Sequence, residues 1–433
     1  MTTFVYQSFE TVMREEFIYY LWENRLLRSE LFTIDGAAVK IISQGNRNYD
    51  SGPDYMDAKI RIDGTLWCGN VEIHVSASDW YRHKHHEDSA YDNVILHVVY
   101  NADCKVGNIP AIEIKGCFDD GIYCMYQSFI KSKRWIACEK MLRDVQAFTM
   151  LSWCERLIVE RMELLVADIE KHLNVNHYDW EETLYQRIMH YMGSKVNNEA
   201  FDRLAMVLPL RVLRKHADNK VQLEAMMFGC AGFLETEFTD SYPALLKREF
   251  KVMKSKFGLL TMPVSYWKKF RMRPSSFPTV RLAQMAMVIH KNDGMFSNII
   301  EKHDIKDVKT MFDIRTNSYW ENHYYFEKVS ARGCRKIGDT TVDMLIINAV
   351  IPVIFCYGKY HDMEDVKCRA LDFLEEMERE NNKVTRQFEK NGLMIESARQ
   401  SQALLHLYDK YCKRRRCLEC VVFHVISSDC KTI

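Results

Sequence analysis

The stretch NYDSGPDYMDAKIRIDGTLWCGNVEIHVSASDW, residues 48–80, contains two runs in which apolar and polar residues alternate. This period of two is typical of β-strands. Asp63-Gly64 separates the two runs, and this dipeptide is a strong signal for a tight hairpin turn. We therefore expect a β-hairpin here, with one face buried and the other carrying polar side chains.

The rest of the first 135 residues predicts a small mixed sheet around this hairpin. Strand 94–100 is apolar on both faces except at His97, so we expect it to be central and covered. Residues 1–35 have a helical pattern, and a short helix is expected within 76–93. The predicted strands are residues 38–43, 58–62, 65–75, 93–100 and 111–115.

Amphipathic helical patterns replace strand signals after about residue 135. The predicted helical stretches are residues 151–173, 180–193, 198–213, 278–291 and 370–390. The apolar segment 344–358 contains Asn348 and Pro352 and is short for a membrane span, so we interpret it as buried core. The predicted class is α+β. A mixed α/β domain over residues 1–135 precedes a helical domain over 136–433 with a C-terminal cysteine cluster.

Composition narrows the function classes. Lys+Arg and Asp+Glu both number 59, which argues against a nucleic-acid coat protein, although local basic patches can still guide a polyanion. Neither a Gly-x-Ser-x-Gly elbow nor a Walker-type loop is found, which argues against an α/β-hydrolase, a kinase and a P-loop ATPase. No signal-peptide pattern is visible, and the fourteen cysteines favour reduced thiols. We expect a cytoplasmic protein with no membrane partner.

Two acids of the hairpin region, Asp54 and Glu72, are candidate catalytic residues and ligands for a divalent cation. Mg²⁺ or Mn²⁺ prefers oxygen ligands, which these carboxylates and the Ile73 carbonyl could supply. His74 lies on the same strand face as Glu72 and could orient or deprotonate an attacking water. A hairpin whose carboxylates merely face water is the alternative. A calcium loop is a further interpretation, with candidate ligands Asn46, Asn48, Asp50 and Asp57.

The Pro53-Asp54 and Glu72-Ile73-His74 motifs resemble those of the PD-(D/E)XK nuclease superfamily, over roughly residues 10–115. The resemblance implies a restriction-endonuclease-like domain and metal-dependent cleavage of DNA or RNA. His74 stands where that superfamily usually has lysine. A catalytically inactive binding or scaffold protein with the same fold is therefore the alternative, and a hydrolase acting on another substrate is a third possibility.

The strand register decides whether the two acids can meet. With the predicted two-residue turn, Asp54 faces Ile73 and lies on the opposite side of the sheet from Glu72. A one-residue bulge would place Asp54 across from His74, and Gly69 is a candidate position for it. The apolar pattern fits better without a bulge, and the preceding proline could instead end the pairing. These alternatives stay open at this point.

The segment DWYRHKHHED, residues 79–88, is rich in groups that bind metals or phosphates. In a helix, Asp79 and His83 would share a face and could contact substrate or the metal. His85 and His86 fit a polar surface turn better. His97 is interpreted as a core histidine that could support a ligand from behind.

Near the C-terminus, Cys412, Cys417 and Cys420 have the spacing C-x₄-C-x₂-C. Closely spaced thiolates can bind zinc or an iron–sulfur cluster, and Cys138 could supply a fourth ligand. Cys430 is a spare candidate. Some nucleases of the resembled superfamily carry such a cluster, although their distant cysteine generally precedes the nuclease motifs. The alternative is a set of reduced thiols beside a solvated basic run.

That basic run offers candidate phosphate contacts. Arg414 and Arg415 lie between the cysteines and are predicted to bind substrate, whereas an ordinary solvated face is the alternative. DNA or RNA is the expected partner.

Longer stretches extend a second resemblance over nearly the whole chain. They are GNRNYDSGPDYMDAKI, LWCGNVEIHVSASDWYRHKHHEDSAYDNVILHVVY, RPSSFPTVRLAQ, INAVIPVIF, ENNKVTRQF, SQALLHLYDKYC and CLEC. In these stretches the chain is similar to an uncharacterised bacterial family, which is known only as a domain of unknown function. The resemblance implies a shared architecture and brings no known activity.

Overall fold

The computed structural model describes residues 13–330 and 336–429. The chain divides into two compact units. The first unit contains the described residues of Met1–Trp153, Lys390–Leu393 and Leu407–Ile433, and the second contains those of Cys154–Glu389 and Met394–His406. This division differs from the predicted one after residue 135, because the C-terminal cysteine segment belongs with the sheet.

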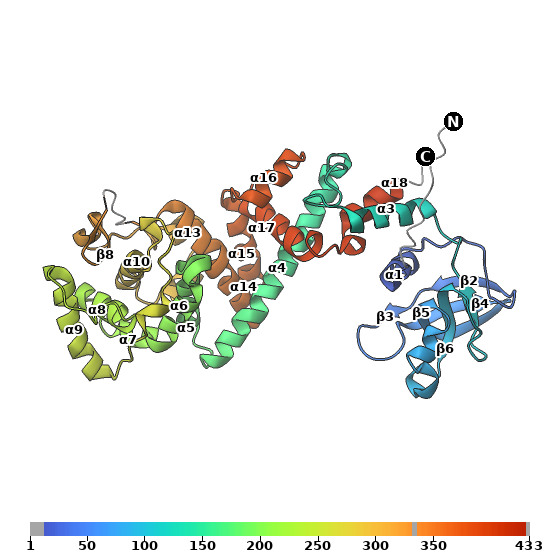
Figure 1. Cartoon of the computed structure of the whole chain (residues 1–433), viewed down its shortest axis with the longest axis horizontal. Coiled ribbons are helices and arrows are strands. Elements are labelled where there is room, and N and C mark those ends of the chain that lie inside the picture. The colour runs from blue at the N-terminus through green and yellow to red at the C-terminus, as the bar shows by residue number, and fades with distance from the viewer. Residues whose placement is uncertain (1–12, 331–335, 430–433) are drawn as a thin grey trace. The chain divides into compact units, whose positions relative to one another are not determined.

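A seven-stranded mixed sheet forms the centre of the first unit (Figure 1). Its strands are β1 (Leu31–Phe32), β2 (Ala38–Ser43), β3 (Asn46–Arg47), β4 (Tyr55–Ile62), β5 (Thr65–Ser76), β6 (Val94–Asn101) and β7 (Ala111–Glu113). Their order is β1-β2-β4-β5-β6-β7, with β3 paired to β4. Pairing is antiparallel as far as β5 and parallel between β5, β6 and β7. The predicted mixed sheet is therefore confirmed, as is the turn at Asp63-Gly64.

Strand β6 is covered on both faces, as predicted, and His97 is fully buried within it. The connection from β5 to β6 contains the expected short helix, α2 (Asp79–Arg82), followed by two 3₁₀ turns. Trp80 of α2 packs with Val94 and Val99 in a small core cluster. This packing fixes the crossover segment against the sheet.

Helix α1 (Glu15–Glu23) packs on β5. The predicted helical pattern covers residues 1–35, of which 1–12 lie outside the described residues and 31–32 form β1 instead. The apolar α1 residues Phe17 and Leu21 are fully buried. On the same helix, the Tyr20 hydroxyl lies 2.9 Å from Ser427 Oγ, and the Tyr20 ring meets Phe423 edge-on. Both partners belong to α18 (Val421–Asp429). These long-range contacts explain why the C-terminal segment groups with the sheet.

The β4–β5 hairpin contains a β-bulge. Ala58 pairs with Gly69 whereas Tyr55 pairs with Val71, so Met56 and Asp57 together oppose a single residue of β5. Asp57 has a φ of 58°, in the left-handed region that a short polar side chain tolerates. The bulge shifts the register by one residue and brings the residue before β4, Asp54, opposite Glu72.

Gly69 therefore has a different role from the predicted one, because the bulge lies in β4. A Cβ atom at Gly69 would lie 2.5 Å from Ile95 Cγ2 and 2.7 Å from the Asn93 carbonyl oxygen. Glycine is needed there because β6 and the chain leading into it approach closely. Of the alternatives left open by the sequence, neither the pairing of Asp54 with His74 nor the unbulged pairing with Ile73 is found.

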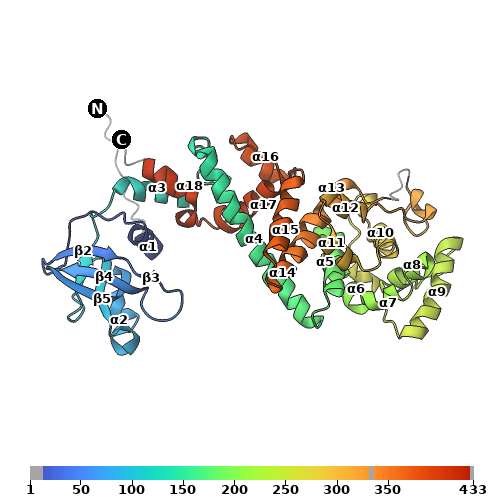
Figure 2. The same cartoon turned by 180° about the vertical axis from the view of Figure 1, so that it is seen from behind.

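The second unit consists mainly of helices, seen from both sides in Figures 1 and 2. They begin with α4 (Ala147–Val175), which starts in the first unit, and continue with α5 (Trp180–Met192), α6 (Ser194–Val207), α7 (Leu210–Arg214), α8 (Lys220–Cys230), α9 (Ser241–Phe257), α10 (Pro278–Lys291), α11 (Met295–Glu301), α12 (Ile305–Thr310), α13 (Asp339–Leu345), α14 (Ile351–Tyr360), α15 (Glu364–Glu376), α16 (Lys383–Lys390) and α17 (Ala398–His406). Helix α3 (Asp120–Lys131) belongs to the first unit.

Three local features of the second unit depart from the sequence prediction. The stretch 198–213 divides into α6 and α7 at Pro209, which cannot continue a helix interior. The stretch 370–390 divides into the end of α15 and α16. A small hairpin, β8 (His323–Tyr325) with β9 (Lys328–Val329), was not predicted, so the unit is not purely helical.

The apolar segment 344–358 lies within one helix, Asp339–Tyr360, formed by α13, a π-helical turn and α14. Its 22 residues make it the one helix of the described ranges that is long and apolar enough to cross a membrane by length and composition. This helix is thus longer than the apolar segment 344–358 that the sequence indicated. However, 72% of its apolar window is buried inside the protein, which agrees with its interpretation as core.

A buried acid in α8 makes the stability of this unit depend on pH. Burial raises the pKa of Glu224 to about 7, against the opposing effects of its hydrogen bond with Tyr242 and the charge of Lys220. The Tyr242 hydroxyl also accepts a hydrogen bond from Trp320 Nε1 at 3.2 Å. Glu224 is therefore protonated in the folded state at a pH where it is ionised in the unfolded chain.

We predict that the contribution of Glu224 to the free energy of unfolding falls by roughly 3 kcal/mol as the pH rises from about 4.5 to 7. The raised folded-state pKa gives a contribution that is complete below the unfolded-state pKa and lost as the pH rises through the folded-state value. Glu224→Gln should lack this part of the decline in urea denaturation measured across the pH range. The exposed Glu199→Gln serves as control. An unchanged decline in Glu224→Gln would contradict the assignment.

Candidate metal centre at the sheet hairpin

The bulge brings the carboxylates of Asp54 and Glu72 together. The Asp54 backbone N–H donates to Glu72 Oε2 at 3.0 Å, and the Ile73 N–H donates to Asp54 Oδ2 at 2.9 Å. The remaining oxygen, Asp54 Oδ1, accepts a hydrogen bond from the Tyr19 hydroxyl at 3.0 Å. Helix α1 supplies this tyrosine. The two acids thus lie side by side rather than on opposite faces of the sheet.

Their proximity and burial disfavour two negative charges. Burial raises the pKa of Glu72 to about 9, and the charge of Asp54 adds to the effect. Burial also raises the pKa of Asp54, against the opposing hydrogen bonds from Ile73 and Tyr19. A cation between or beside the carboxylates would favour their ionised forms.

Histidines surround the other oxygen of Glu72. Glu72 Oε1 lies 3.5 Å from His74 Nε2 and 3.2 Å from His85 Nε2. His74 Nε2 is in turn 3.2 Å from His83 Nδ1. His74, His83 and His85 each offer a nitrogen within 4.8 Å of the other two. The three imidazoles therefore form one cluster, and a Glu72 oxygen faces two of them, His74 and His85.

Three separations in this group match those between neighbouring ligands of a metal ion. With metal–ligand bonds of about 2.0–2.1 Å, neighbouring ligand atoms of a tetrahedron lie about 3.3 Å apart. The three distances given above are close to that value. The His85 Nε2 atom is buried and has no hydrogen-bond partner within the described residues, although it lies close to Glu72 Oε1. An orphaned ring nitrogen facing a carboxylate oxygen fits a metal ligand.

His97 holds His74 from behind. His74 Nδ1 lies 2.9 Å from His97 Nε2, so the other ring nitrogen of His74 faces the cluster. Burial lowers the pKa of His74 to about 2 and that of His97 to about 4, with neighbouring histidine charges acting in the same direction. Neutral imidazole is the form that binds metals, and a partner on its second nitrogen fixes its orientation.

The turn after α2 explains how His85 reaches this cluster. Lys84 has a φ of 63°, so the chain reverses between His83 and His85. His85 then stacks on Tyr91 with ring centroids 3.9 Å apart. The structure places His85 against the site and not in the polar surface turn expected from the sequence. His86, by contrast, is exposed and lies 3.5 Å from Glu87.

Asp79 and His83 lie on α2 and at its end, as the helical spacing predicted, but only His83 contacts the cluster. The buried Asp79 accepts a hydrogen bond from the Ser76 N–H and forms an ion pair with Arg82 at 2.9 Å. It therefore fixes the start of the crossover segment. Arg82 itself is largely exposed and could contact a polyanion.

The basic residues near the C-terminus have different surroundings. Arg415 donates hydrogen bonds to the carbonyl oxygens of Ser132 and Arg134, so its guanidinium supports the loop after α3. Arg414 is exposed. The predicted role of both in substrate binding stays a prediction.

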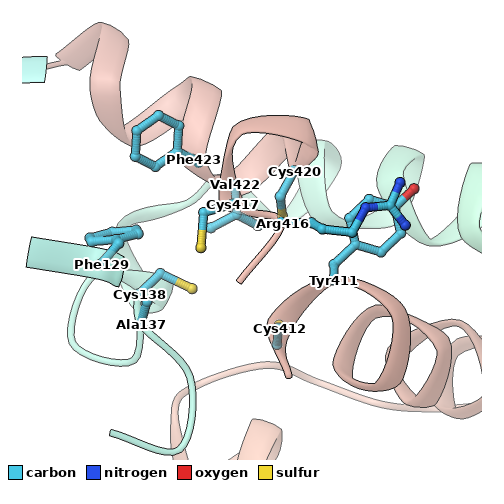
Figure 3. Close-up of a pocket in the computed structure, with 10 residues that line it drawn as sticks. All are labelled: Phe129, Ala137, Cys138, Tyr411, Cys412, Arg416, Cys417, Cys420, Val422 and Phe423. Atoms are coloured by element: carbon cyan, nitrogen blue, oxygen red, sulfur yellow. The ribbon is translucent and has the colours of Figure 1, made fainter. Parts of the chain in front are cut away.

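The four predicted cysteine ligands come together in one cavity (Figure 3). Cys138 follows α3, and the other three lie in the C-terminal segment. We call this the cysteine pocket, defined by Cys138, Cys412, Cys417 and Cys420. Cys430, the spare candidate, lies outside the described residues.

Sequence reasoning missed two residues beside the carboxylates. Tyr19 binds Asp54, but it lies within an ordinary helical pattern and carries no signal of this contact. Arg47 lies over the Tyr19 ring, 4.5 Å from its centroid, and its charge lowers the pKa of Asp54. Arg47 is the basic residue of the stretch GNRNYD. Its place in the loop that leads to Asp54 could have suggested that it acts on this acid.

A protein-family model matches residues 15–383, and its description is a protein of unknown function, DUF2851. The chain belongs to the DUF2851 family. This confirms the resemblance to an uncharacterised family that the sequence indicated. No curated protein and no solved structure matches this DUF2851 chain.

For this DUF2851 protein we predict that Zn²⁺ or Mn²⁺ binds and raises the melting temperature. His85→Ala should weaken binding by at least about 10-fold, because even residues that only support a metal ligand contribute about 10–100-fold to affinity. Isothermal titration calorimetry measures the affinity directly. His86→Ala is the matched control from the same segment. Equal affinities in the two variants would remove His85 from the site.

Proposed function

We propose that this protein is a metal-dependent hydrolase that cleaves phosphodiester bonds in DNA or RNA. The observation that carries the proposal is that Asp54 lies beside Glu72, whose other oxygen faces a cluster of three histidines. Such a set of carboxylate and imidazole ligands is suited to divalent cations used in hydrolysis.

The order of elements supports this reading. Helix α1 is followed by an antiparallel hairpin that carries both acids, then by a helical crossover and the parallel strand β6. The PD-(D/E)XK superfamily, which the motifs resemble, has this order of helix, acidic strands, helix and strand. We therefore also propose that the first unit has a restriction-endonuclease-like fold.

Each residue of the site has a proposed role. Asp54 and Glu72 bind the cation, and the Tyr19 hydroxyl holds the Asp54 carboxylate in place. A bound Mg²⁺, Mn²⁺ or Zn²⁺ would supply a Lewis acid for the phosphate and a water of lowered pKa. His74 acts here as a ligand rather than a base, because His97 holds one of its nitrogens and Glu72 faces the other.

Positive charge at the edge of the site favours an anionic substrate. The Arg82 side chain is 70% exposed, and its charge acts on His74. Arg47 lies on the other side, beside Tyr19. Two guanidinium groups flanking the acids could contact phosphates of a nucleic acid. A cytoplasmic location is also part of the proposal, supported by the free thiols of every cysteine that the structure describes.

One observation favours a non-catalytic binding protein as the second candidate. His74 takes the position of the superfamily's lysine, and its burial lowers its pKa to about 2, so it carries no positive charge. A scaffold that binds nucleic acid without cleaving it would tolerate this loss.

Nuclease assays with single-stranded, duplex and branched DNA and with RNA test the proposal. With Mn²⁺ or Mg²⁺ we expect cleavage of at least one substrate. Asp54→Asn and Glu72→Gln should lower its rate by about 100-fold or more, since loss of a ligand costs no less than loss of a group that supports one. Both changes remove charge and keep the side-chain volume.

Asp92→Asn, at an exposed position near the end of the crossover segment, is the matched control and should keep full activity. Circular dichroism should show that all three variants are folded. Cleavage that survives both Asp54→Asn and Glu72→Gln would overturn the assignment. Binding of nucleic acid without cleavage by the wild-type protein would support the scaffold.

A further inference from the structure

The cysteine pocket is a separate cavity, whose lining residues include neither Asp54 nor Glu72. Besides its four cysteines, its wall is mostly apolar, with Phe129, Tyr411, Val422 and Phe423 among the lining residues. Figure 3 shows Cys138 approaching from the loop after α3, while the remaining thiols come from the C-terminal segment. All four thiols are free. Cysteine sulfurs from two distant parts of the chain therefore line one mostly apolar cavity.

Cys420 lies at the start of a helix. It directly precedes α18, whose N-terminus favours negative charge, and the Phe423 N–H donates to the Cys420 carbonyl oxygen at 3.0 Å. A helix N-terminus favours the thiolate form of a cysteine, and the thiolate is the form that binds metals.

The spacing of the sulfurs distinguishes a cluster from a single ion. In a four-cysteine zinc site, bonds of about 2.3 Å place the sulfurs about 3.8 Å apart. Among the described residues, no three cysteine sulfurs lie within 4.8 Å of one another, so the four that line this pocket are spaced more widely than zinc ligands. Four cysteine thiolates are also the usual ligands of iron–sulfur clusters.

We propose that the cysteine pocket binds an iron–sulfur cluster that fastens the C-terminal segment to the loop after α3. Two surrounding contacts join the same segments. Arg415 donates a hydrogen bond to the Ser132 carbonyl oxygen, and the Trp135 ring stacks on the Tyr408 ring with centroids 5.2 Å apart. Helix α18 continues from the pocket to Tyr20 of α1. The cluster therefore stabilises the helix that carries Tyr19, and the inference does not depend on hydrolytic activity.

The test is to purify the full-length protein without oxygen and to measure iron, acid-labile sulfide, zinc and the visible spectrum. We expect a brown protein with about four irons and four sulfides per chain. Cys138→Ser and Cys417→Ser should each lower the iron content several-fold. Cys124→Ser, at an exposed position of α3, is the matched control and should keep it.

A second measurement covers variants that fail to fold. Removing iron from the wild-type protein with a chelator should lower its melting temperature, and reconstitution with iron and sulfide should restore it. Zinc in place of iron, or a colourless protein that takes up no iron on reconstitution, would overturn the proposal. Iron retained equally by Cys138→Ser and Cys124→Ser would remove Cys138 from the site.

Discussion

The candidate active site depends on the bulge at Met56 and Asp57. One extra residue in β4 shifts the register with β5, so that Asp54 meets Glu72 instead of Ile73. Without it, strand alternation would send the two carboxylates to opposite faces of the sheet. The left-handed backbone of Asp57 is a modest local cost for this arrangement. Bulges commonly redirect side chains next to active sites.

Once the two acids share a face, burial makes their charges costly. Glu72 is 4% exposed and has Asp54 on one side and histidines on the other. Neutral imidazoles cannot compensate two carboxylates, whereas a divalent cation can. Neighbouring elements hold this set in place: α1 through Tyr19, and β6 through His97. The cysteine pocket lies in the same compact unit and joins its C-terminal segment to the loop after α3.

Local patterns in the sequence predicted the five strands β2, β4, β5, β6 and β7, the turn and the candidate acids, since alternation and Asp-Gly chemistry act over a few residues. The two-residue strands β1 and β3 are too short to show such a pattern. The position of the bulge could not be predicted, because Asp57 is not a glycine and Met56 fits the unbulged pattern. His85 depends on the chain reversal at Lys84, which tertiary packing selects. The spacing of the C-terminal cysteines suggested a shared site. Their grouping with the sheet depends on α18 contacting α1, separated by about 400 residues of chain.

Anomalous diffraction from crystals grown with Mn²⁺ tests the central claim most directly, because it locates the cation without assuming any activity. The account predicts a peak within coordination distance of a Glu72 oxygen, with Asp54 or the histidine cluster completing the ligands. A crystal structure in which Asp54 and Glu72 point to opposite faces of the sheet would contradict the account. So would a fully occupied Mn²⁺ site that contacts neither acid.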